Sequence, residues 1–162
     1  MAAGLGVNMY ADLWSFALST YARSGCEAAC LRLQEQGADV CLLLCGAWLE
    51  QRGVTPSAER MQALVQVAGP WQAQVVEPLR QVRTQWRAMA QQDEALAGLR
   101  EQVKALELEA ERALLARLEA VAQAWPSGEG EGQQKWLEGL ATEAANLDHD
   151  ALQQLRVAAT GT

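Results

Sequence analysis

Residues 39–53 read DVCLLLCGAWLEQRG, and this stretch predicts the centre of the fold. Residues 40–49 are apolar or nearly so on every side, which favours a helix enclosed by its neighbours over a surface helix with one wet face. Ten such residues are too few to cross the roughly 30 Å core of a bilayer. Asp39 can cap the first turn, Arg52 suits the negative end of the helix dipole, and Gly53 can adopt the left-handed conformation that ends a helix. We therefore expect a buried central helix with chemically marked ends.

Helical patterns flank the central stretch on both sides. Residues 12–21 and 26–36 place apolar side chains on one face of a helix, and each run ends next to a glycine. After the central stretch, Thr55-Pro56-Ser57 predicts the start of another helix, which Gly69-Pro70 would end. No alternation of period two is long enough for a strand. The sequence predicts an all-α protein with an N-terminal orthogonal bundle of short helices around the central one.

A longer helical pattern begins at Pro70. Apolar residues recur every three or four positions up to Met89 and again from Leu96 onward, which is typical of a coiled-coil seam. Pro78 would kink or restart this helix, and Asp93 weakens the seam between the two blocks. Residues 126–132, PSGEGEG, predict a loop. We expect the helical segments after this loop to return against the long helix as a C-terminal hairpin.

Charge divides the chain into two parts. Residues 1–92 hold seven Lys or Arg and seven Asp or Glu, whereas residues 93–162 hold six against thirteen. This change indicates two domains, a helical bundle over 1–92 and an acidic, coiled-coil-like helical extension over 93–162. The acidic balance argues against a nucleic-acid or anionic membrane partner, because both attract a cationic surface. The first twenty residues lack the Lys or Arg of a secretory signal, so we expect a cytoplasmic protein.

Three segments resemble a known family. They are LWSFALSTY (residues 13–21), CLRLQEQGADVCLLLCGAWLEQRG (residues 30–53) and WQAQVVEPLRQVR (residues 71–83). Together they are similar to a proteobacterial family of small uncharacterised proteins, a domain of unknown function, over about residues 12–90. The resemblance implies a bacterial, cytoplasmic, helical protein without an assigned activity and with a variable C-terminal part. Cys41 departs from the family pattern, in which we expect an asparagine.

The four cysteines form two CxxxC pairs, Cys26/Cys30 and Cys41/Cys45. Each pair would share one face of a helix, and a reversal near Gly37 would place Cys26 beside Cys45 and Cys30 beside Cys41. Such an arrangement could form two disulfides or bind zinc. The competing interpretation is that all four are buried thiols of a reducing compartment, because free cysteine behaves as a small apolar residue.

Six further residues are candidates for contact with a ligand or partner. Arg80, Arg83 and Arg87 occupy positions i, i+3 and i+7 of a helix, so they form a basic stripe with Trp86 alongside. The stripe could bind a phosphate or an acidic segment, or it could be a solvated face that pairs with acidic residues of the same chain. Gln34 and Asp39 could line a pocket, although a hydrogen bond to a helix end and a helix cap explain them as well.

Three hypotheses of function follow. The seam and the lack of a catalytic pattern favour a non-enzymatic adaptor or regulatory protein that binds a protein partner, or a second copy, through the long helix. A second hypothesis is a small-molecule-binding protein or enzyme with a polar pocket formed by Gln34, Asp39 and Arg80 or Arg83. A third is a zinc or thiol-redox protein that uses the four cysteines. We predict no catalytic residue, and no cofactor other than zinc under the third hypothesis.

Overall fold

The computed structural model describes residues 12–128 and 135–160, and every regular element in these residues is a helix. The predicted all-α class is confirmed. No helix within the described ranges is long and apolar enough to cross a membrane.

The central helix α4 (Val40–Gln51) is the most deeply buried element. Every residue from Cys41 to Glu50 is buried, as the sequence predicts. The Asp39 side chain accepts a hydrogen bond from the Leu42 N–H (3.3 Å), which caps the first turn. Gly53 follows the helix with φ of 67°, the left-handed conformation that glycine adopts without strain. Within the described residues, six other helices pack against α4, so its residues 41–50 are covered on every face.

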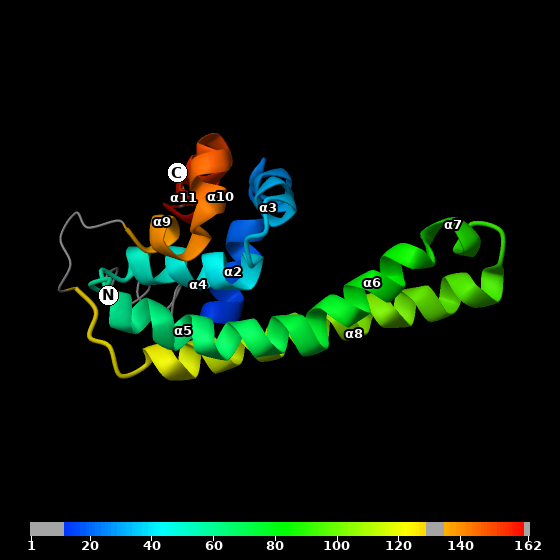
Figure 1. The fold of residues 1–162 in the computed structure, drawn as a ribbon, viewed down its shortest axis with the longest axis horizontal. Helices are drawn as coiled ribbons and strands as arrows, with labels where there is room; N and C mark the ends of the chain where they lie inside the picture. The colour runs from blue at the N-terminus through cyan, green and yellow to red at the C-terminus, as the bar shows by residue number, and fades with distance from the viewer. Residues whose placement is uncertain (1–11, 129–134, 161–162) are drawn as a thin grey trace, which may run out of the picture.

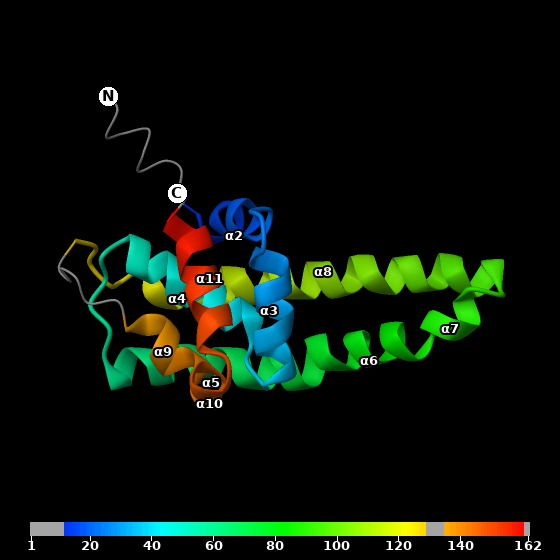
Figure 2. The ribbon, with the colours of Figure 1, turned by 90° about the horizontal axis from the view of Figure 1, so that it is seen from above.

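Three helices from the N-terminal half surround α4: α2 (Leu13–Tyr21), α3 (Cys26–Glu35) and α5 (Ala58–Trp71). Local chemistry fixes where two of them begin. The Asp12 carboxylate accepts from the Ser15 N–H (2.8 Å) at α2, and the Ser57 hydroxyl accepts from the Arg60 N–H (3.1 Å) at α5. In Figure 2, α3 crosses over α4 beside the last helix of the chain.

The helix that begins at Ala58 continues through Pro70, so the predicted stop at Gly69-Pro70 is wrong. A π-helical segment, η1 (Gln72–Val76), follows α5 directly, and α6 (Glu77–Gln85) continues from it. Proline has no N–H, so Pro70 cannot donate the i→i−4 hydrogen bond of an α-helix. The wider π turn that follows accommodates this break in the pattern of backbone hydrogen bonds. Pro78 lies in the first turn of α6, where proline is tolerated.

The chain reverses after the short helix α7 (Arg87–Ala90), and α8 (Glu94–Ala122) runs back beside α6 and α5. The expectation that the long helical pattern continues in one direction past Asp93 is therefore wrong. The Asp93 side chain accepts from the Leu96 N–H (3.1 Å), so the residue that weakens the seam starts a new helix instead. Residues 77–106 project from the rest of the protein as an antiparallel helical pair, which we call the arm (Figure 1).

The last helices are α9 (Trp136–Ala141), α10 (Glu143–Leu147) and α11 (His149–Thr160). They pack on α4 and α3 rather than along the long helix, which corrects the predicted C-terminal hairpin. The apolar face of α9 is the reason: Trp136 and Leu137 are fully buried in the core. Gly46 allows this approach, since a Cβ there would lie 2.9 Å from Leu140 Cδ1. The predicted boundary near residue 92 falls at the tip of the arm, and residues from both sides of it form the core.

Candidate functional site

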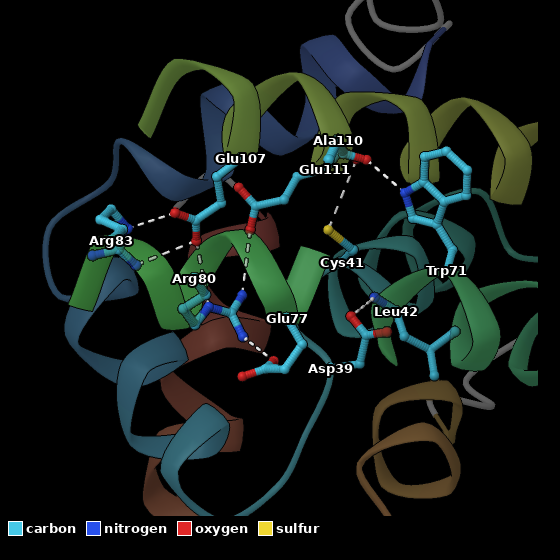
Figure 3. Close-up of polar contacts among 10 residues, drawn as sticks. All are labelled: Asp39, Cys41, Leu42, Trp71, Glu77, Arg80, Arg83, Glu107, Ala110 and Glu111. Atoms are coloured by element: carbon cyan, nitrogen blue, oxygen red, sulfur yellow. Dashed lines mark hydrogen bonds and ion pairs between the residues drawn. The ribbon is translucent and has the colours of Figure 1, made fainter. Parts of the chain in front are cut away.

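The base of the arm holds a cluster of ion pairs between α6 and α8 (Figure 3). Glu107 of α8 is buried, with 7% of its surface exposed, and both carboxylate oxygens accept hydrogen bonds from Arg83. Arg80 donates to the second oxygen of Glu107 (3.4 Å) and to Glu77 (2.8 Å). The second terminal nitrogen of Arg80 lies 3.7 Å from Glu111. The predicted basic stripe is thus, for Arg80 and Arg83, a set of structural ion pairs with acidic residues of the same chain.

Burial sets the protonation of this cluster. Burial, with repulsion from Glu107 as the second cause, raises the pKa of Glu111 to about 7, so its carboxyl is partly protonated at neutral pH. Burial also raises the pKa of Asp39, although the backbone hydrogen bonds that it accepts oppose the shift. The hydrogen bonds to Glu107 raise the pKa of Arg83, which remains charged. The cluster therefore contains one carboxyl, that of Glu111, which ionises less readily than an exposed glutamate.

A polar pocket of about 300 Å³ opens next to this cluster. Gln34, Asp39 and Arg80 all line it, so the structure brings together three residues that the second hypothesis of function requires. Gln72 and Glu77 complete its polar wall. The Gln72 Oε1 atom is shielded from solvent and has no hydrogen-bond partner among the described residues. The polar wall of the pocket therefore includes one shielded acceptor that a ligand with a donor could satisfy.

The other two predicted contact residues lie elsewhere, on the arm. Arg87 is exposed in α7, close to the tip, and it does not belong to the Glu107 cluster. Trp86 is half-buried and lines a shallow groove of about 500 Å³. The remaining wall of this groove comes from α8 and consists of Leu99, Gln102, Val103, Ala105, Leu106 and Glu109. The six candidates thus divide between the base of the arm and its length.

The four cysteines are buried free thiols. The interaction with Cys30 lowers the pKa of the Cys26 thiol, whereas the pKa of Cys30 is raised by its interaction with Cys26 and by burial. Burial raises the pKa of Cys41 and of Cys45, which keeps these thiols protonated and weakly nucleophilic. Across residues 12–128 and 135–160, no three His, Cys, Asp or Glu side chains converge in a way that could hold a metal ion. The third hypothesis therefore finds no preformed ligand set.

Sequence reasoning missed the acidic partners of the cluster. Glu107 and Glu111 are four residues apart and share one face of α8, and Arg80 and Arg83 are three apart on α6. This matched spacing is the signal that could have found them once the reversal at residues 91–93 was known. Sequence reasoning also missed a second buried carboxylate, that of Glu50 in α4. Its two oxygens accept hydrogen bonds from Arg156 of α11, at 2.9 and 2.7 Å.

These features define an all-helical protein with a covered central helix, a projecting arm and a buried ion-pair cluster where the two meet. The family model described as "Protein of unknown function (DUF2390)" matches residues 12–118, about two thirds of the chain, so the protein belongs to this family. The match confirms the resemblance to a domain of unknown function and extends past residue 90 to include most of α8. Neither the comparison with curated proteins nor that with solved structures found a match.

Proposed function

We propose that the protein is a non-enzymatic interaction module whose arm pairs with the arm of a second copy. The observation that carries the proposal is the seam of α8. Its residues Leu96 and Val103 are partly covered, whereas Leu99 and Leu106, on the neighbouring positions of the same seam, are 50% and 55% exposed. A coiled-coil seam requires both sets of positions to be buried. The single helix α6 therefore leaves half of the seam for another partner.

The groove beside this uncovered half fits a helix. Trp86 lines one side of it, and Leu99, Val103 and Leu106 follow each other along α8 at spacings of four and three residues. Apolar residues at these spacings are the usual contacts of a helix that packs into a groove. Two antiparallel arms that pack through this face would form a four-helix bundle with two-fold symmetry. The apolar side chains of each arm would then enter the groove of the other arm.

The distribution of charge favours a second copy as the occupant. The arm, residues 77–106, contains five Lys or Arg and four Asp or Glu, although the chain as a whole has a net charge of −7. The rest of the chain is therefore strongly acidic, and two copies would repel each other over most of their surfaces. The arm is the region where two copies can approach with the least repulsion.

A non-enzymatic role fits the side chains that gather at the base of the arm. Arg80 and Arg83 are held by carboxylates of the same chain, and the buried thiols of Cys41 and Cys45 are protonated. Both arrangements suit stability better than nucleophilic chemistry. We place the protein in the bacterial cytoplasm, because the family resemblance implies it and because free buried cysteines suit a reducing compartment.

Light scattering coupled to gel filtration tests the pairing. We expect the wild-type protein to have twice the 17.6 kDa mass of the chain at micromolar concentration. The double variant Leu99→Glu/Leu106→Glu should be a folded monomer, because two charges would have to be buried in the paired seam. Leu31→Glu is the matched control, since Leu31 is also a half-exposed leucine of a helix, in α3 and away from the arm.

We expect the Leu31→Glu control to keep the wild-type mass. A wild-type monomer at these concentrations would contradict the proposal. So would a dimer that survives the double substitution with unchanged affinity, because its interface would then lie outside the arm.

A further inference from the structure

A second pocket lies beside the polar pocket, between α2, α4 and α8, and its wall is mainly apolar. Its apolar lining residues include Trp14, Leu18, Leu44 and Leu115. Its volume is about 170 Å³. This is close to the roughly 150 Å³ of an engineered apolar cavity that binds benzene in another protein. The apolar pocket therefore has room for one small ring or a short branched chain.

Three polar side chains reach the wall of the apolar pocket: Tyr21, Gln34 and Glu111. Gln34 lines the polar pocket as well, so it separates the two spaces. Among the described residues, the Glu111 carboxylate accepts no hydrogen bond, and its one ion pair is the 3.7 Å contact with Arg80. With 29% of its side chain exposed, Glu111 is accessible to a ligand that enters the pocket. An apolar cavity with a few convergent polar groups is the usual form of a small-molecule site.

The charge around the two pockets selects the kind of ligand. Four carboxylates lie here, from Asp39, Glu77, Glu107 and Glu111, and the two guanidinium groups of Arg80 and Arg83 offset only part of their charge. The shielded Gln72 Oε1 adds an acceptor without a donor among the described residues. The guanidinium group of Arg112 also lies near the apolar pocket, 5.1 Å from the centre of the Trp14 ring, so three cations stand against four carboxylates. An organic cation would add positive charge where carboxylates are in excess and would donate a hydrogen bond to one of them.

We propose that the apolar pocket binds a small primary amine, with its ring or branched chain against Trp14 and Leu115 and its ammonium group donating a hydrogen bond to Glu111. A neutral alcohol of the same shape would fill the apolar space but would not supply the missing charge. A carboxylate of the same shape would be repelled by Glu111 and its acidic neighbours. This binding site is independent of the pairing of two arms, because its residues lie in the body of the protein and at the base of the arm.

The test is a titration of the full-length protein with benzylamine, benzyl alcohol and benzoate, followed by NMR of the Trp14 indole N–H. These probes have similar rings and differ in charge. We expect benzylamine to bind at least tenfold more tightly than benzyl alcohol, and benzoate not to bind. Glu111→Gln preserves the shape of the side chain and should remove the preference for the amine. Glu101→Gln is the matched control, because Glu101 is an exposed glutamate of the same helix.

Circular dichroism confirms that each variant is folded before the titrations are compared. Equal affinity of the wild-type protein for benzylamine and benzyl alcohol would overturn the proposal. The same conclusion would follow if none of the probes shifted the Trp14 signal at millimolar concentration, or if the preference for the amine survived Glu111→Gln. The pairing of two arms is measured separately by molecular mass, so the failure of one proposal leaves the other unaffected.

Discussion

The body around α4 and the arm are built from similar helices but differ completely in burial. In α4, ten consecutive residues are buried, whereas residues 77–106 of the arm include no buried residue. Among the described residues, six helices contact α4, whereas within the arm α6 and residues 94–106 of α8 leave much of their surface exposed. Apolar spacing along a helix therefore gives its possible contact face, and the number of neighbouring helices decides how much of this face is buried. An uncovered face then becomes available for another molecule.

The largest effect is expected in the body, at the buried ion pair between Glu50 and Arg156. The side chain of Glu50 is 1% exposed, and Arg156 holds both of its oxygens. Arg156→Met would leave a buried charge without its partner, which typically costs about 3–5 kcal/mol of unfolding free energy. Urea denaturation at a fixed protein concentration measures the loss. Arg32→Met is the control, because the ion pair of Arg32 with Asp148 lies at the surface and should contribute little.

A smaller effect is expected where the body meets the arm. Arg83→Met removes two hydrogen bonds from the buried Glu107, which among the described residues then keeps only its 3.4 Å contact with Arg80. We expect a loss of about 1–3 kcal/mol of unfolding free energy, the usual cost of an unsatisfied charged group. Arg87→Met, one turn further along the arm, should leave the stability nearly unchanged. Equal losses for the two variants would show that the cluster does not anchor the arm.

The smallest expected effect is a pH dependence that originates at Glu111. Its pKa is about 7 in the folded protein and near 4.5 in an unfolded chain, so the folded state binds more protons between these values. Stability should therefore fall as the pH rises from 4.5 to 7, and the fall should level off above pH 7. We expect a contribution of about 1 kcal/mol, because solvent reaches part of this side chain. Glu111→Gln should flatten this part of the profile, and an unchanged slope would assign it to another group.

Local chemistry made the body of the fold predictable. Asp12, Asp39 and Ser57 each precede a helical pattern, and each accepts a backbone hydrogen bond in the first turn. Residues 40–49 are apolar on every side of the helix, and only complete burial removes all of this apolar surface from water. The central position of α4 therefore also follows from the sequence. These signals act over three or four residues and do not depend on the rest of the chain.

The arm and the candidate site were less predictable, because they depend on contacts between distant residues. Asp93 interrupts two blocks of the same apolar rhythm, and the sequence does not distinguish a weak point in one helix from the start of a second. Glu107 lies 24 residues from Arg83, and Glu50 lies 106 residues from Arg156. Gln34, Asp39 and Arg80 could be proposed individually, but their shared pocket and its acidic neighbours required the reversal of the chain.

The position of α9 and α11 against α4 has a consequence for synthesis on the ribosome. Residues 136–159 provide part of the cover of the central helix, with Trp136, Leu152 and Leu155 fully buried. These residues are translated long after residues 40–51 of α4. A nascent chain that has emerged only as far as the end of α8 therefore exposes part of the apolar surface of α4. Binding of a chaperone to this intermediate would protect it until translation supplies the missing cover.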